Sequence, residues 1–232
     1  MRQLISGVVL SGILLCPTAQ ADVTAYKATY ASEFDIGIAM SGELTRSLRQ
    51  TSNGQWLFST NAEAMIASIK ENTSVTFSND HVVPHTYLYK RKVLGKTREA
   101  KLTFDWNNNQ VTNDVEKKPW TMQVPDGTQD KLSYQLQMRL DLISGKKGPF
   151  SYQIADGGRL KTYDFNIIGS EKITSPMGEY DAIKVEMDRG TDAKRETYIW
   201  YAPALDYMII KLKQTEPDGK TYALQLKSLE TE

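Results

Sequence analysis

The stretch from Asp126 to Ile143 reads DGTQDKLSYQLQMRLDLI, and it decides how the rest of the chain is interpreted. At about 100° per residue, its apolar side chains form two stripes on a helix. One stripe contains Leu132, Leu136, Leu140 and Ile143, and the other contains Tyr134, Met138 and Leu142. A surface helix needs one apolar stripe, so two stripes predict a helix at about residues 129–143 that is largely surrounded by protein.

The same helical phase assigns a polar face and two ends. Ser133, Gln137 and Asp141 make the polar face, so Gln137→Ala is expected to cost little stability. Leu136→Ala is expected to cost about 2–5 kcal/mol, as for a buried leucine. Thr128 or Asp130 is the expected N-cap, with Asp130 and Ser133 as capping residues, and Gly145 to Gly148 end the helix.

Most of the chain on either side of this helix alternates as β-strands do. Tyr26, Ala28 and Tyr30 share one face of the first expected strand, and turn sequences such as Ser52-Asn53-Gly54 and Asp156-Gly157-Gly158 separate later ones. Met65–Ile69 fits either a bulge or one helical turn. The pattern predicts a mainly β fold, a single antiparallel curved sheet or open barrel of about 12–14 strands packed around one central helix.

Composition limits the function. The chain has 232 residues, with 28 basic against 28 acidic side chains. This length is enough for one domain with a real core, expected at residues 22–232. The balanced charge argues against a nucleic-acid partner, which usually requires a basic excess.

The N-terminus has the pattern of a secretory signal peptide. Arg2 precedes the apolar run Leu4–Leu15, and Ala19-Gln20-Ala21 places small residues before a cut after Ala21. Cys16 raises the alternative of a lipoprotein, but a large residue, Leu15, precedes it. Cleavage at residue 21 predicts a cysteine-free periplasmic chain that begins at Asp22 and has no apolar run long enough to span a membrane.

Few residues suggest chemistry. His81 and His85 are the two histidines; the β-branched residues and proline between them favour extended chain over a helical metal clamp. The sequence has no Gly-x-Ser-x-Gly elbow and no phosphate loop. We therefore predict no catalytic residue, no metal site and no cofactor.

Arg139 is the most informative polar residue, because the helical phase places it inside the apolar arc. A buried arginine needs a carboxylate, several carbonyl groups or an anionic ligand. Three interpretations follow. Arg139 reaches the sheet rim and pairs with an aspartate or glutamate, it contacts a ligand headgroup, or the helix has a different phase from the one assumed.

Three stretches carry a family resemblance. They are Asp130-x-Leu132-Ser133 with Tyr134, Leu136 and Arg139; Thr174–Val185; and Tyr198–Pro203 leading into Ile210-Lys211-Leu212. Together they resemble an exported bacterial family, domain of unknown function 3108 (DUF3108). The resemblance implies an envelope location and a β-rich fold around one helix, and it brings no activity or catalytic residues. Structural roles are expected for Asp130, Leu132, Ser133, Leu136, Leu140, Gly178, Trp200 and Pro203.

The sequence leaves three functional hypotheses. The first is a non-enzymatic periplasmic protein that binds a lipid or other amphiphile in the concavity of the sheet, with Arg139 as the candidate ligand contact. The second is a structural or protein-interaction module of the envelope whose own helix fills the cavity. The third is a hydrolase of envelope polymers, which requires two carboxylates about 5–10 Å apart in a cleft.

Overall fold

A computed structural model describes residues 23–35, 39–64, 67–78, 80–190 and 194–231. The predicted signal peptide and Cys16 lie outside the described residues. Among the described residues, no helix combines the length and the apolar character that crossing a membrane requires.

All strands of the described chain belong to one antiparallel sheet of fourteen strands, as predicted. The strands are β1 (Tyr26–Asp35), β2 (Ala39–Gln50), β3 (Trp56–Ala64), β4 (Ala67–Ser78), β5 (His81–Val93), β6 (Lys96–Asp105), β7 (Gln110–Val115), β8 (Lys118–Gln123), β9 (Phe150–Asp156), β10 (Arg159–Ser175), β11 (Gly178–Asp188), β12 (Glu196–Ala202), β13 (Met208–Thr215) and β14 (Thr221–Thr231). Of the stretch Met65–Ile69, residues 67–69 belong to β4, and Met65 and Ile66 lie outside the described residues. His81 and His85 lie in extended chain on β5.

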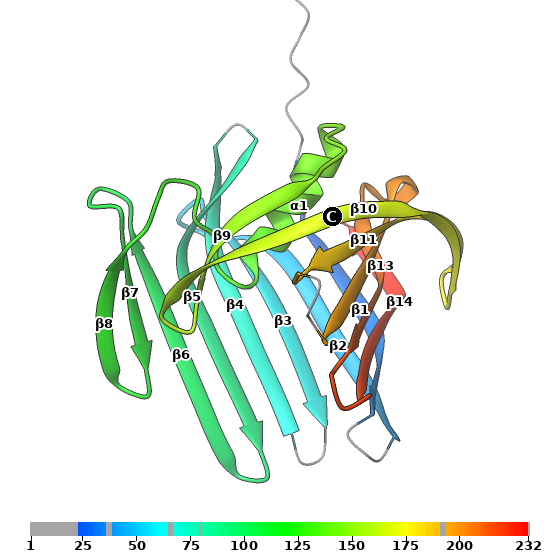
Figure 1. The fold of residues 1–232 in the computed structure, drawn as a ribbon, viewed down its shortest axis with the longest axis horizontal. Helices are drawn as coiled ribbons and strands as arrows, with labels where there is room; N and C mark the ends of the chain where they lie inside the picture. The colour runs from blue at the N-terminus through cyan, green and yellow to red at the C-terminus, as the bar shows by residue number, and fades with distance from the viewer. Residues whose placement is uncertain (1–22, 36–38, 65–66, 79, 191–193, 232) are drawn as a thin grey trace, which may run out of the picture.

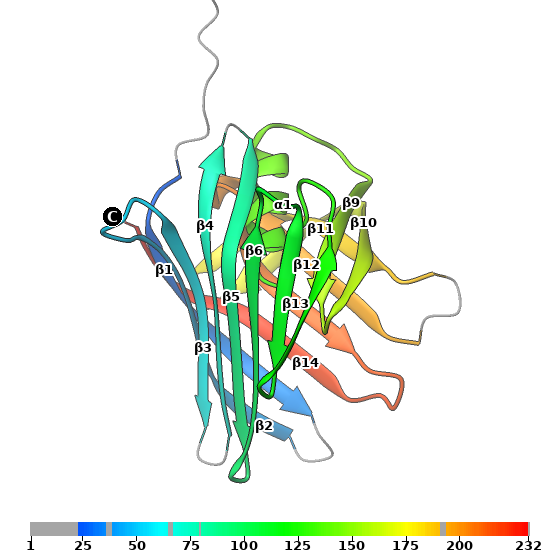
Figure 2. The same cartoon turned by 90° about the vertical axis from the view of Figure 1, so that its left-hand side faces the viewer.

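The order of the strands places the helical segment between the two edges of the sheet. β1 pairs with both β2 and β14, so the first and last strands are neighbours in the middle of the sheet. The edge strands are therefore β8 and β9, which precede and follow the helix in sequence. The chain must cross from one edge to the other, and it does so through the concave side, where the helix lies (Figures 1 and 2).

The described residues contain one α-helix, α1 (Ser133–Ile143), which begins four residues later than the predicted range. Leu132, Leu136 and Leu140 are buried, as are Met138 and Leu142 of the second stripe.

Two expectations for the helix are wrong. Ser133, Gln137 and Asp141 are buried, because strands cover the face that the sequence assigns to solvent. Ile143, expected on a buried stripe, is 38% exposed because the helix ends there.

Gln129, in the segment that precedes the helix, contacts two distant parts of the sheet. The Gln129 N–H donates to the Gln153 carbonyl and the Gln129 carbonyl accepts from the Ala155 N–H, which attaches this segment to edge strand β9. The Gln129 side-chain amide donates to the Val82 carbonyl on β5 at 2.8 Å. The strands from β5 through β1 and β14 to β9 thus form a ring that Gln129 closes by hydrogen bonds rather than by a strand pair.

The two edges also meet at a glycine. Gly158 lies between β9 and β10 with φ +76°, and a Cβ there would lie 1.3 Å from Cζ2 of Trp120 on β8. Gly157 also has positive φ, but a Cβ there would meet nothing within 4 Å. At position 158 both the positive φ and the nearby Trp120 ring require glycine, whereas at position 157 only the positive φ does.

Gly157→Ala is expected to cost about 1 kcal/mol, and Gly158→Ala about 2 kcal/mol because Trp120 must also move. Urea denaturation of both variants measures this difference. In a Trp120→Ala background the two alanine variants should cost the same. If the excess for Gly158→Ala persists without the Trp120 ring, the edge contact does not explain it.

Candidate functional site

The N-terminus of α1 is capped by a buried carboxylate. Asp130 Oδ1 accepts from the N–H groups of Leu132 and Ser133, each at 2.8 Å, and the Asp130 N–H donates to Ser133 Oγ. Thr73 Oγ1 on β4 donates to Asp130 Oδ2 at 2.6 Å. This reciprocal arrangement satisfies N–H groups that a helix start leaves without partners and attaches the helix to the sheet. Thr128, the other candidate cap, donates its hydroxyl to the Pro125 carbonyl instead.

Asp130 has no solvent-exposed surface, and burial raises the pKa of its carboxyl to about 6. The hydrogen bonds from Thr73, Leu132 and Ser133 act in the opposite direction, because they stabilise the ionised form. Burial is the larger effect, so the folded protein retains the Asp130 proton to a higher pH than an unfolded chain does.

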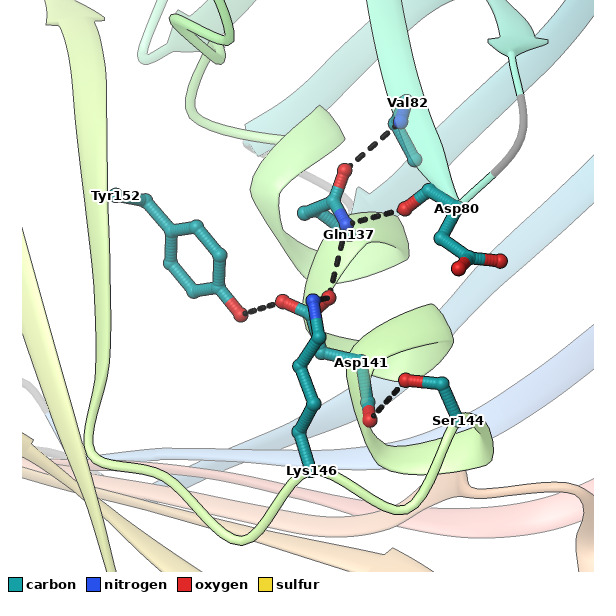
Figure 3. Close-up of polar contacts among 7 residues, drawn as sticks. All are labelled: Asp80, Val82, Gln137, Asp141, Ser144, Lys146 and Tyr152. Carbon is teal, nitrogen blue, oxygen red and sulfur yellow. Dashed lines mark hydrogen bonds and ion pairs between the residues drawn. The ribbon is translucent and has the colours of Figure 1, made fainter.

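The polar face of α1 forms a hydrogen-bonded network with two strands (Figure 3). Gln137 Oε1 accepts from the Val82 N–H at 2.8 Å, and Gln137 Nε2 donates to the Asp80 carbonyl and to Asp141 Oδ1. Asp141 Oδ2 accepts from the Tyr152 hydroxyl on β9, and Oδ1 also accepts from Lys146 Nζ at 2.7 Å. The helix is thus held between β5 and β9.

The network explains how the open edge of β5 is satisfied. β6 pairs with β5 from Thr86 to Val93, so residues 81–85 extend beyond β6. There Gln137 Oε1 accepts a hydrogen bond from the Val82 N–H, and Gln129 Nε2 donates one to the Val82 carbonyl. Two side-chain amides therefore replace the missing strand, which meets the requirement that buried backbone groups find partners.

A cavity of about 340 Å³ lies beside the helix, lined by helix residues other than those of this network. Its apolar lining consists of Val23, Leu48, Phe77, Leu136, Leu140 and Ile143, and its polar lining consists of Thr24, Arg139 and Asp206. The volume lies near the lower end of the roughly 300–1,000 Å³ usual for small-molecule sites.

Arg139 is half-buried in the wall of this cavity. Its Nε donates to the Asp206 carbonyl at 2.8 Å, and its guanidinium carbon lies 5.4 Å from the centre of the Tyr26 ring. Among the described residues, Arg139 forms no ion pair. The expectation of an aspartate or glutamate partner is therefore wrong, because the group that meets Arg139 is a backbone carbonyl.

A second arginine, Arg46 on β2, was not identified from the sequence. Arg46 is 7% exposed, and its Nη1 donates to Gln135 Oε1 at 2.7 Å. It lies over the Tyr30 ring at 5.7 Å and forms no ion pair within the described part of the chain. The sequence did contain a signal, because Arg46 alternates with the buried residues Leu44 and Leu48 on the inner face of its strand.

Arg46 and Arg139 both line a small cavity of about 20 Å³, which shares Leu136 and Arg139 with the larger one. Burial raises the pKa of the Tyr26 and Tyr30 hydroxyls, and the positive charges of both arginines act to lower it. The two arginines therefore act electrostatically on the same pair of tyrosines.

The other residues with expected structural roles lie away from this cavity. Trp200 on β12 is buried, and its Nε1 donates to Glu171 Oε1 on β10. Gly178 begins β11 after the turn, with φ +128°. Pro203 is exposed and begins the short 3-10 helix η1 (Pro203–Leu205), which precedes the Asp206 carbonyl that Arg139 contacts.

Comparisons with known proteins identify the family and the fold. The family model described as Protein of unknown function (DUF3108) matches residues 25–226, which confirms the resemblance. No functionally curated protein matches the sequence. The chain is similar to the crystal structure of a beta-barrel-like protein, domain of unknown function DUF1849, from Brucella abortus. That match has a TM-score of 0.57 at 11% identity and covers 90% of this chain and 98% of that one. It establishes a shared β-barrel-like fold.

Two further structures align at lower TM-scores. The Pseudomonas aeruginosa MucA/MucB complex gives a TM-score of 0.34 at 10% identity, with 90% of this chain but 52% of that chain covered. A putative outer membrane lipoprotein-sorting protein domain from Vibrio parahaemolyticus gives 0.24 at 12% identity, with 90% and 86% covered. At these scores neither structure informs the site.

Proposed function

We propose that this protein, which belongs to the family described as Protein of unknown function (DUF3108), is an exported envelope protein that binds a single-chain amphiphile beside α1. The observation that carries the proposal is the 340 Å³ cavity, which combines six apolar lining residues with three polar ones, one of them an arginine. Apolar lining with a few placed polar groups is typical of small-molecule sites. The modest volume favours one acyl chain over a lipid with several.

The N-terminal sequence supports the proposed periplasmic location. An apolar run preceded by Arg2 and followed by Ala19-Gln20-Ala21 is the pattern of an exported, cleaved precursor. In that compartment an amphiphile from the envelope is within reach of the protein.

The lining favours binding over hydrolysis. Among the described residues that line the cavity, Asp206 supplies the one carboxylate, whereas two-carboxylate hydrolysis requires a pair about 5–10 Å apart. The network around Gln137 and Asp141 supports a second candidate, a structural module in which α1 serves as a fixed plug. The two candidates differ in whether the cavity takes up a ligand.

Titration with N-phenyl-1-naphthylamine, a neutral apolar dye whose fluorescence rises in apolar surroundings, tests the proposal. We expect saturable binding to the wild type. Thr24 and Ile143 both line the cavity and are exposed, so Thr24→Trp combined with Ile143→Trp should fill it at little cost to the fold. The loss of apolar contact area should weaken dye binding by at least about tenfold.

Ile168→Trp is the matched control, because Ile168 is 47% exposed on β10 and does not line the cavity. It should bind the dye as the wild type does. Dye binding that is absent from the wild type, or that is equally strong in the filled variant, would contradict the proposal and favour the plug. If the wild type binds the dye as expected, native mass spectrometry of protein recovered from the periplasm would identify the natural occupant.

A further inference from the structure

We propose that the amphiphile is an anion, and that Arg46 and Arg139 together hold its acid group while its chain contacts the apolar residues of the cavity beside α1. This inference rests on the proposed function and adds the chemical class of the ligand. The class is a single-chain carboxylate or phosphate monoester.

The first step is the unneutralised charge of Arg46. Its side chain is more than nine-tenths buried, and a guanidinium cannot escape burial by losing its proton. Burying a charge is costly unless an opposite charge or several hydrogen bonds compensate it. Within the described residues, Arg46 has one amide acceptor and one aromatic ring, and its Nε has no hydrogen-bond partner.

The second step is the neighbour of Arg46 on β3. Thr60 is paired directly with Arg46 across the two strands, and Thr60 is also buried. Its Oγ1 likewise has no hydrogen-bond partner in the described chain. Arg46 Nε and Thr60 Oγ1 are therefore two adjacent buried donors without an acceptor among the described residues, and a buried polar atom without a partner requires an explanation.

The third step is the position of Arg139. It lines both cavities, so it lies near Arg46 in the small cavity and near the apolar residues that line the larger one. Its Nε donates to the Asp206 carbonyl, and within the described chain its terminal N–H groups make no hydrogen bond. An acid group beside these arginines would therefore lie at one end of the apolar cavity, as an amphiphile requires.

The fourth step is the local charge balance. Among the described residues, the charged ones that line the two cavities are Arg46, Arg139 and Asp206, which gives a net positive charge. Asp206 meets Arg139 through its carbonyl rather than its carboxylate. Guanidinium groups bind carboxylate and phosphate by charge-assisted, often bidentate, hydrogen bonds. The arrangement thus favours an anionic head over a neutral or cationic one.

Calorimetric titration with three probes tests the inference: dodecanoate, dodecanol and inorganic phosphate. The wild type should bind dodecanoate about 10–100-fold more tightly than dodecanol, since hydrogen bonds to a charged group are stronger than those to a neutral one. Inorganic phosphate, which lacks the chain, should bind far more weakly than dodecanoate. Dodecanoate should also raise the thermal midpoint.

Arg46→Gln and Arg139→Gln should each reduce dodecanoate affinity about tenfold or more and leave dodecanol affinity within about twofold. Arg49→Gln is the matched control, because Arg49 is exposed on the same strand as Arg46 and should change neither affinity. If Arg46→Gln does not fold, Arg139→Gln still tests the inference. Arg139 is half-buried and lies on the helix, so its replacement leaves the buried face of the sheet unchanged.

The outcomes separate the two proposals. Equal binding of dodecanoate and dodecanol by the wild type would overturn the anionic headgroup and retain the proposed function. Binding of neither chain would overturn the proposed function itself. If inorganic phosphate binds as tightly as dodecanoate, the ligand is a free anion rather than a lipid headgroup. If dodecanoate affinity is unchanged in both arginine variants, the arginines do not hold the acid group.

Discussion

Gln137→Ala is expected to lower the free energy of unfolding by about 2–4 kcal/mol, although a helical wheel places Gln137 on the polar face of α1. The side chain is buried, and it accepts from the Val82 N–H and donates to the Asp80 carbonyl and Asp141. Alanine would leave the buried Val82 N–H without a partner, at about 1–3 kcal/mol, and would also open a small cavity.

Urea denaturation measures this loss, with three companions. Leu136→Ala should cost a comparable amount, about 2–5 kcal/mol, because it removes a buried side chain from the apolar core. Gln137→Met keeps most of the volume and should recover only the cavity part of the loss. Gln153→Ala, which removes an exposed amide contact to Thr162, should cost little. A Gln137→Ala variant as stable as Gln153→Ala would show that the network does not hold the helix.

Asp130→Ala is expected to cost about 2–4 kcal/mol at pH 7. It removes the acceptor for the N–H groups of Leu132 and Ser133 and leaves the buried Thr73 hydroxyl without its partner. Loss of an N-cap costs about 0.5–2 kcal/mol, and an unsatisfied buried group about 1–3 kcal/mol. Relief of the buried carboxylate offsets part of this, so the total is less than the sum of the two losses. Thermal and urea denaturation at pH 7 measure it.

Asp130→Asn separates hydrogen bonding from charge, because its carbonyl oxygen still accepts from both N–H groups. In the wild type the folded-state pKa of about 6 lies above the unfolded value of about 3.9. The folded state therefore binds the proton more tightly, so this stabilisation is full below about pH 4 and is lost as pH rises through about 6.

The stability of the wild type relative to Asp130→Asn should thus fall by about 2 kcal/mol between pH 4 and pH 7. Comparing the two proteins cancels the titration of other groups. A difference that stays constant over this range would contradict the raised pKa, and a difference that grows would reverse its direction.

The pattern of the sequence was sufficient for the fold class. Alternation such as Tyr26, Ala28 and Tyr30 reports burial of one face of a strand, and turn residues mark where each strand ends. The spacing of Leu132, Leu136 and Leu140 likewise identified a helix covered by protein. These signals are local, because the spacing of side chains along one element is a property of that element alone.

The partners of polar residues depended on chain that is distant in sequence. Gln137 is buried because residues 81–85 of β5 extend beyond β6, and no spacing within the helix reports where another strand ends. The sequence shows Arg46 alternating with two leucines. Its role depends on its surroundings, which are the Gln135 amide and an aromatic ring, with no carboxylate partner among the described residues. Periodicity therefore determined the elements and their apolar faces. Assembly of the sheet decided which polar groups are enclosed, because burial of a polar group depends on what packs against it.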